Sequence, residues 1–424
     1  MKKLFAVMLV AAFIFGVFAN VAVAEDRFAL SGAVRVRAWT IDNSDFDTLD
    51  DDKYEYWDQR FRVQGTITPA DGVKAVFRVD LFEDIWGGNN WTGSRPSAGV
   101  NASTFGDVSS SEAGELQVDR AYLDITKGIV NIKAGEAYWG LGNNYAYDNN
   151  QPGIGISIKT PVVISAGFLK IDEDPLGSYG TSTDLTDDEN YEDVNHYFVN
   201  VGYKSDAFSV DVFYAMQQDD TAAEVQPTLI GAMGKFGIGP VNVMAELDMF
   251  GGDSAAGEDY VGMQFIADAS MKMSDALTLG LQLVYSDGTD DANETKLVRM
   301  PNAFFGSLYY ANYGAFAPDA PNLLGSGDVM DPLGTESGAM GGGIYATFKP
   351  IDVLTLAGNV MYLTGVEDSV GTMFDSGYVI NATAEYMIAQ NATIAVGYMF
   401  ADVEKVSVDT DSATAYVARF QVGF

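Results

Sequence analysis

The stretch that decides the fold is Thr414–Phe424, T-A-Y-V-A-R-F-Q-V-G-F, in which apolar and polar residues alternate. Successive side chains of an extended strand point to opposite sides, so this stretch has one apolar face and one mostly polar face. The apolar face carries Tyr416, Ala418, Phe420, Val422 and Phe424, and the other carries Val417, Arg419, Gln421 and Gly423. Such a strand, finishing on an aromatic residue, is typical of the closing strand of a membrane β-barrel. We therefore expect Tyr416, Phe420 and Phe424 to form an assembly signal.

The first 24 residues have the pattern of a secretory signal peptide. Met1-Lys2-Lys3 is followed by an apolar run that ends at Phe18, and Ala22-Val23-Ala24 precedes Glu25. A basic start, a short apolar core and an A-x-A site are typical of a cleaved signal. We expect residues 1–24 to be removed and residues 25–424 to form the barrel. A membrane-anchoring helix is the alternative, but the apolar run is short for one.

Composition narrows the class of protein further. The chain has 424 residues, no cysteine and a formal net charge of −35. Without cysteine an exported protein has no disulfides, and no later segment offers the roughly 18 consecutive apolar residues of a membrane-spanning helix. Nucleic-acid binding needs a basic footprint, which this chain lacks. We expect no nucleic-acid partner, and acidic loops that attract divalent cations.

From Phe28 onward the chain repeats one unit: an alternating segment, a short turn, a second alternating segment and a longer polar loop. This repeat predicts an all-β fold, a transmembrane antiparallel up-and-down β-barrel of 16–18 strands with short periplasmic turns and long extracellular loops. The longest predicted loops are residues 85–115, 172–193 and 287–338. A soluble β-sandwich or propeller also alternates and is the competing interpretation. The signal peptide, the terminal strand and aromatic residues near the ends of the apolar faces favour the membrane barrel.

Most arginine residues lie on the inward face of the first five predicted strands. The predicted pore-lining basic wall is Arg35, Arg37, Arg60, Arg62, Lys74, Arg78, Arg120 and Lys133, joined by Arg419, which barrel closure brings beside Arg35 and Arg37. The predicted pore-lining acidic residues are Asp80, Asp124 and Asp148. Rings of charge in a narrow pore set ion preference, so we interpret these residues as a constriction. The alternative is that they are ordinary ion pairs that keep the lumen polar. Glu136 has the wrong parity for the lumen and counts only if the strand bulges there.

The signal peptide, the segment V-D-R-A-Y-L-D at Val118–Asp124, the basic wall and the terminal Phe424 resemble the trimeric general porins of Gram-negative outer membranes. The resemblance covers the layout of the whole mature chain. It implies a homotrimer in the outer membrane, in contact with outer-membrane lipid and lipopolysaccharide. By the same resemblance residues 141–152 are the candidate loop that folds into the pore, and residues 85–115 latch onto a neighbouring subunit.

The leading functional hypothesis is a porin for passive diffusion of ions and small hydrophilic solutes, with a slight preference for anionic solutes at its neck. A surface-exposed structural or adhesive barrel with a plugged lumen is one alternative, suggested by the long loop 287–338. A substrate-specific channel is another, for which only Trp39, Phe82 and Tyr122 offer clear lumen aromatic residues.

Little in the sequence indicates an enzyme. The single histidine, His196, stands at the start of a predicted strand, and there is no G-x-S-x-G motif or zinc-ligand pattern. The acidic stretches 42–52 and 287–294 lack the spacing of a known calcium loop. We expect no catalytic residue, no dedicated metal site and no cofactor, with adventitious Ca²⁺ or Mg²⁺ on the acidic loops.

Overall fold

A computed structural model describes residues 27–43, 46, 48, 53–86, 117–172, 193–219, 225–254, 259–288, 294–301, 338–367, 374–405 and 409–424. The predicted signal peptide lies outside the described residues, as do most of the three predicted long loops. No helix in the described part of the chain is long and apolar enough to cross a membrane.

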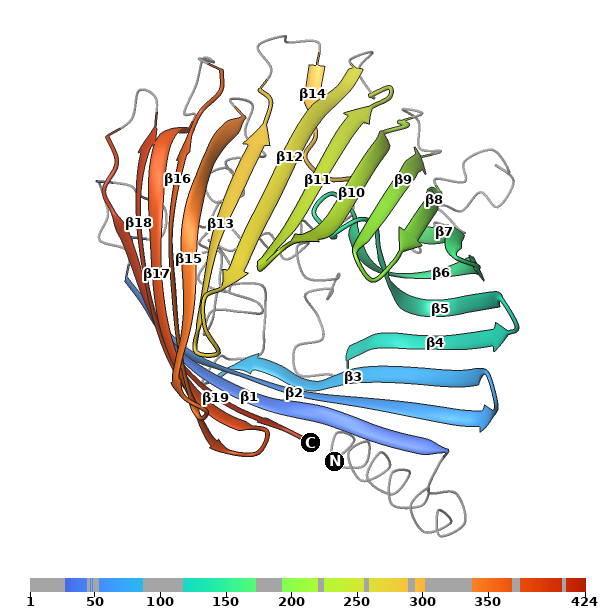
Figure 1. Cartoon of the computed structure of the whole chain (residues 1–424), viewed down its shortest axis with the longest axis horizontal. Helices are drawn as coiled ribbons and strands as arrows, with labels where there is room; N and C mark the ends of the chain where they lie inside the picture. Colours follow the sequence, from blue (N-terminus) through green and yellow to red (C-terminus); the bar gives the residue numbers. More distant parts are fainter. Residues whose placement is uncertain are drawn as a thin grey trace, which may run out of the picture.

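The described strands form one antiparallel β-barrel, in which neighbours in sequence are neighbours in space and the first strand pairs with the last (Figure 1). The strands are β1 (Phe28–Asp42), β2 (Lys53–Ala70), β3 (Val73–Ile85), β4 (Gln117–Lys127), β5 (Val130–Gly140), β6 (Asp148–Lys159), β7 (Val162–Asp172), β8 (Val194–Lys204), β9 (Phe208–Asp219), β10 (Thr228–Ile238), β11 (Val241–Gly251), β12 (Asp259–Lys272), β13 (Leu277–Ser286), β14 (Glu294–Lys296), β15 (Ala339–Ile351), β16 (Leu354–Thr364), β17 (Phe374–Ala389), β18 (Ala392–Lys405) and β19 (Ala413–Gly423).

Of these 19 described strands, β14 is the one that does not belong to the wall. β13 pairs directly with β15, while the three-residue β14 pairs in parallel with the start of β12. The wall therefore has eighteen strands, the upper limit of the predicted range. The predicted all-β barrel with short turns at one end is confirmed.

The short turns follow from local backbone chemistry. Gly72, Gly128 and Gly239 adopt φ angles of 75°, 60° and 58° in the β2–β3, β4–β5 and β10–β11 turns. This left-handed region is open to glycine at little cost, and tight β-hairpin turns require it.

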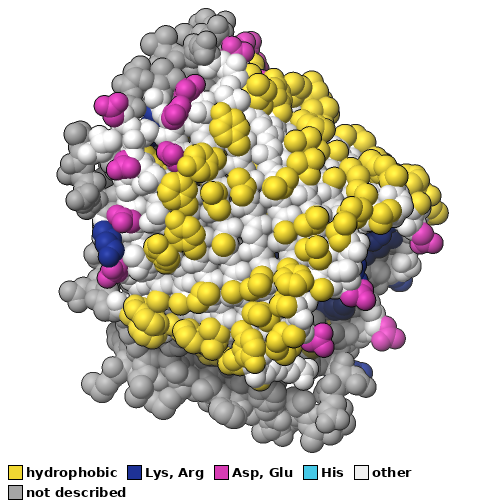
Figure 2. All heavy atoms as spheres, turned by 60° about the vertical axis from the view of Figure 1, so that its left-hand side comes forward, with side chains coloured by type: hydrophobic (Ala, Val, Ile, Leu, Met, Phe, Trp, Pro, Cys, Tyr) yellow, Lys and Arg dark blue, Asp and Glu magenta, His cyan; other side chains and the backbone are white. Residues whose placement is uncertain are grey.

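Burial along the strands is the reverse of that in a soluble protein. In β13, Leu279, Leu281 and Leu283 are 40–46% exposed, whereas Gln282 and Ser286 are almost fully buried. Hydrophobic side chains spread over the outer face in the same way, with acidic side chains towards its margins (Figure 2). A soluble sandwich would bury its apolar face, so this pattern excludes the competing interpretation. A lipid-facing belt explains it.

Closure depends on the last residue as well as on the last strand. β19 pairs with β1 from Asp42↔Thr414 to Ala33↔Gly423, and Gly32 and Phe424 then exchange two backbone hydrogen bonds of 2.9 and 3.0 Å. A Cβ atom at position 32 would lie 2.5 Å from Cζ of Phe424, so the ring occupies the space that glycine leaves free. Tyr416, Phe420 and Phe424 all lie on the exposed outer face. Their role as an assembly signal stays a prediction.

Gly32→Val should therefore weaken barrel closure. The added side chain displaces the Phe424 ring, and overpacking of this kind costs about 1–3 kcal/mol. Urea unfolding of the refolded barrel, followed by heat-modifiable gel migration, measures the loss. Gly234→Val is the matched control, because a Cβ atom at this strand glycine meets nothing nearer than 4.0 Å. Equal midpoints for the two variants would contradict the closure argument.

Candidate functional site in the barrel lumen

Cross-strand register brings the predicted basic wall together. Arg35 lies across from Arg60, and Arg37 lies across from Arg419 on the closing strand. Further along the wall, Arg78 lies across from Arg120. Opposed like charges destabilise a sheet unless counter-charges are close. The wall must therefore contain carboxylates.

At least five arginine residues of this wall pair with carboxylates. The close pairs are Arg37–Asp58 at 2.9 Å, Arg62–Asp80 at 2.5 Å, Arg419–Glu385 at 2.7 Å, and Arg78–Asp119, and Arg120 lies 3.8 Å from Asp119. A fifth carboxylate, Asp124, lies in register between Lys74 and Lys133 and accepts a hydrogen bond of 2.5 Å from Asn131. The nine predicted cations are thus interleaved with at least six carboxylates, since Glu83 lies across from Arg60 as well.

Three of the carboxylates that bond to arginine were not predicted from the sequence. Asp58 and Glu385 have lumen parity on their strands, so the alternation could have found them. Asp119 could not be found in this way, because parity places it on the outer face with Ala121. The β3–β4 register shifts between Arg78 and Val79, which leaves Asp119 without a partner residue on β3. A β-bulge re-aims side chains, and here it brings Asp119 within 4.0 Å of Arg62 as well as onto Arg78.

Residues 137–152 form a β-hairpin that leaves the wall, and we call it the neck hairpin. The last five residues of predicted loop 141–152 are strand, because β6 begins at Asp148 and pairs with β5 up to Gly140↔Asp148. The connecting segment is only 141–147, since alternation and hydrogen bonding resume at its end. Asp148 lies at the end of this segment, hydrogen-bonded to Tyr138 and close enough to Arg120 of the basic wall to interact with its charge.

The tip of the neck hairpin extends into the lumen and contacts β8, β10 and β11. These strands follow two to five places after β6 around the barrel, and we call them the far wall. The backbone N–H of Asn143 donates to Oε2 of Glu246 at 2.5 Å, and Nζ of Lys235 donates to Oδ1 of Asn143 at 2.8 Å. At the base of the tip, the hydroxyl group of Tyr147 lies 3.1 Å from Nδ1 of His196. The barrel is therefore narrowed from the β5–β6 side.

A second inward segment packs on the first. After β14, Val298 and Met300 are buried, and the backbone N–H of Met300 donates to the carbonyl oxygen of Ala146 at 3.0 Å. Part of predicted loop 287–338 is thus inside the barrel, while residues 302–337 lie outside the described residues. Two chain segments, far apart in sequence, build the narrow region together.

The lumen has more aromatic residues than parity indicated. Trp39 is buried and donates its indole N–H to Asp58 at 2.8 Å, as expected for a lumen residue. Tyr122 lies beneath the Lys133 ammonium group, whereas the side chain of Phe82 lies outside the described residues. The additional buried aromatic residues on the strands and the neck hairpin are Trp139, Tyr145, Tyr147, Phe198, Phe213, Phe250 and Tyr345. Tyr145 and Tyr147 lie in the connecting segment, where alternation breaks, whereas those on regular strands could have been found by parity.

The far wall carries the opposite charge. Glu246 and Asp248 are buried on the inner side of β11, and Asp248 accepts a hydrogen bond of 2.9 Å from Gln264 on β12. The two side chains are 1% and 0% exposed, so they bind neighbouring parts of the protein instead of lining the open passage.

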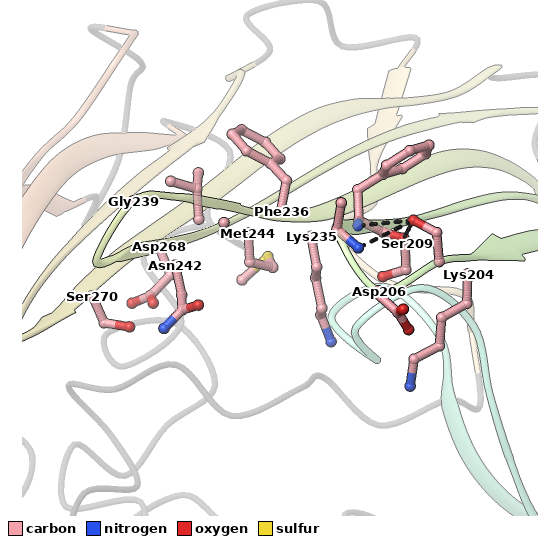
Figure 3. Close-up of a pocket in the computed structure, with 15 residues that line it drawn as sticks. Lys204, Asp206, Ser209, Lys235, Phe236, Gly239, Asn242, Met244, Asp268 and Ser270 are labelled. Atoms are coloured by element: carbon pink, nitrogen blue, oxygen red, sulfur yellow. Dashed lines mark hydrogen bonds between the residues drawn. The ribbon is translucent and has the colours of Figure 1, made fainter.

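Below the tip, towards the short turns, a cavity of about 570 Å³ opens among β8–β12. Lys204, Lys235 and Asp206 project into it on one side, and Asn242, Asp268 and Ser270 on the other (Figure 3). Lys235 is thus shared between this cavity and the tip of the neck hairpin.

The lumen shows no arrangement for covalent chemistry in the described residues. Both ring nitrogens of His196 are engaged, with the Tyr147 hydroxyl at 3.1 Å and Oε1 of Gln217 at 2.9 Å. No group of three or more His, Cys, Asp or Glu side chains in the described ranges is placed to hold a metal ion. Glu136 lies across from Ala121 and shares its side of the strand, as parity indicates.

No protein-family model matches the sequence, and no curated protein matches it. The fold, in contrast, matches solved outer-membrane proteins. OccK9 (OpdG) of Pseudomonas aeruginosa superposes with a TM-score of 0.60 at 11% identity, over 94% of this chain and 99% of that chain. OccAB4 of Acinetobacter baumannii gives 0.59 at 12% identity, over 95% and 100%. A BenF-like porin from Pseudomonas fluorescens Pf-5 gives 0.58 at 13% identity, over 94% and 99%.

The superpositions establish that these proteins share a fold with this chain, and at identities this low they establish the fold alone. Together with the closed wall and the apolar exterior, the fold confirms the expected outer-membrane barrel. The solved barrels it matches are Occ-type proteins and a BenF-like porin, so the finer resemblance to trimeric general porins is not what the comparisons support.

Tyr147→Phe should destabilise the barrel. Oε1 of Gln217 can only accept a hydrogen bond, so His196 donates from Nε2 and accepts from the Tyr147 hydroxyl at Nδ1. Removing the hydroxyl leaves a buried acceptor without a partner, which costs about 1–3 kcal/mol. Urea unfolding measures the loss, with the lipid-facing Tyr214→Phe as the matched control. A midpoint equal to that of the control would show that the contact has no energetic role.

Proposed function

We propose that this protein is a substrate-selective channel of the outer membrane that passes small solutes bearing a carboxylate group. The carrying observation is the set of nine cations on one wall, several of them held in place by carboxylates, beside a lumen that the neck hairpin narrows. A carboxylate moving along this wall exchanges one guanidinium partner for the next. Passage is passive, so the channel needs no catalytic group and no cofactor.

Selective passage accounts for the lumen better than general diffusion does. A general pore needs only a wide polar passage. Here two inward segments meet, and buried aromatic residues surround them. The comparison supports the same choice: OccK2 (OpdF) was solved in complex with glucuronate, and OpdK with vanillate. Both ligands carry a carboxylate and a ring.

Replacing Arg60 and Arg62 together with alanine should shift ion preference towards cations. The double change removes two cations from the basic wall and leaves Asp80 without its partner at 2.5 Å. We expect the anion-to-cation permeability ratio to fall about twofold or more, since charge at a narrow site sets selectivity. Reversal potentials across planar bilayers in a salt gradient measure this ratio.

Two further variants control this experiment. Lys127→Ala with Lys349→Ala removes two exposed cations near the short turns and should leave the ratio unchanged. Asp119→Asn removes the carboxylate that bonds to Arg78, so it should shift the ratio towards anions. If the Arg60/Arg62 variant keeps the ratio of the unchanged protein, the basic wall has no selective role.

The other expected partners remain part of the proposal. The apolar exterior suits outer-membrane lipid, and acidic loops would bind lipopolysaccharide through adventitious Ca²⁺ or Mg²⁺. The homotrimer rests only on the resemblance to general porins, and residues 87–116, which include most of the expected latch, lie outside the described residues. Migration of the unboiled protein on gels, before and after heating, distinguishes a trimer from a single barrel.

A further inference from the structure

The neck hairpin has no backbone pairing with the wall on either side in the described ladders. β4 pairs with β5 only up to Ala121↔Glu136, and β6 pairs with β7 only up to Gly153↔Leu169. Between these points β5 and β6 pair with each other alone. Something other than the barrel's hydrogen-bonded ladder must therefore hold this hairpin in place.

A glycine lies next to each point where the hairpin leaves the wall. Gly135 has a φ angle of 121°, and a Cβ atom there would lie 2.3 Å from the carbonyl oxygen of Ala121. A Cβ atom at Gly153 would lie 2.6 Å from the carbonyl oxygen of Phe168. Glycine allows the backbone to bend and approach closely at both stems.

The tip is held at two points by the far wall. Glu246 accepts from the backbone N–H of Asn143 at 2.5 Å, and Lys235 donates to the side-chain oxygen of the same residue at 2.8 Å. Glu246 lies on β11 and Lys235 on the adjacent β10. Asn143 is therefore held between the carboxyl group of Glu246 and the ammonium group of Lys235. We call this pair of bonds the tip anchor.

The surroundings make the Glu246 bond a strong one. Glu246 is 1% exposed, and a hydrogen bond is electrostatically stronger where water is excluded. Gly142, with a φ angle of 57°, seats the tip beside it, since a Cβ atom there would lie 2.8 Å from Cδ of Glu246 and 2.7 Å from the Phe213 ring. The tip thus fits one place on the far wall.

We propose that Glu246 and Lys235 are positioning residues that set the bore of the channel by anchoring Asn143. Without the tip anchor the hairpin moves about its glycine stems, and the narrow region widens. This inference rests on the proposed function as a channel, but it does not depend on which solute passes.

The test is single-channel conductance in planar bilayers. Glu246→Ala and Lys235→Met should each raise occupancy of a larger-conductance state about tenfold or more, because a hydrogen bond to the tip is lost. Glu246→Gln keeps an acceptor for the Asn143 N–H and should fall between these variants and the unchanged protein. Lys349→Met is the matched control for Lys235→Met, because it removes an exposed lysine of β15 beside the short turn to β16.

A covalent link in place of the tip anchor tests the proposal even if the anchor variants fail to fold. The chain has no cysteine, so Asn143→Cys with Lys235→Cys can be bridged by a bifunctional thiol reagent with a reducible link. Bridged channels should show the smaller conductance, and reduction should convert the same channels to the larger one. Each single cysteine variant, treated alike, should show no reversible change.

The outcomes separate the two proposals. If the unchanged protein inserts but never conducts, the channel function is wrong. If it conducts, and the anchor variants and the bridged double variant all match it, the tip anchor does not set the bore and this inference is overturned.

Discussion

The structure depends on one constraint: a chain in lipid must satisfy every backbone N–H and C=O group within itself. The barrel meets this constraint by closing β1 onto β19, and the exchange of hydrogen bonds between Gly32 and Phe424 extends the closing ladder to the last residue. Once the ladder is closed, the outer side chains are free to be apolar and the inner ones polar. The lipid-facing leucine residues of β13 and its buried Gln282 are both consequences of closure.

The neck hairpin is the place where this constraint is relaxed. Backbone can leave a membrane barrel only where it lines or enters an aqueous interior. Residues 137–152 do so, and side chains replace the lost ladder: Glu246 and Lys235 at the tip, Tyr147 and His196 at the base. The hairpin is thus held by side chains, through these polar contacts and through a buried apolar cluster that includes Trp139, Leu141 and Phe213, whereas the barrel is held by many backbone bonds.

The charges of the lumen show how register and local irregularity act together. Register alone opposes Arg37 and Arg419, which would repel each other without the nearby Asp58 and Glu385. A bulge supplies Asp119 to a third arginine, Arg78. The wall is therefore not a bare row of cations but a network in which carboxylates hold the guanidinium groups in place.

The sequence by itself determined the barrel, the strand faces, the short turns and the meeting of Arg419 with Arg37. These follow from the two-residue period of a strand and from the pairing of first and last strands. The tertiary structure alone decided the rest: Asp119 turns inward, residues 148–152 are strand rather than loop, and a segment after β14 packs on Ala146. The anchoring role proposed for Glu246 also comes from the tertiary structure. The physical reason is that periodicity describes regular strands, whereas a bulge, a detached hairpin and contacts across the lumen depend on neighbours far away in the chain.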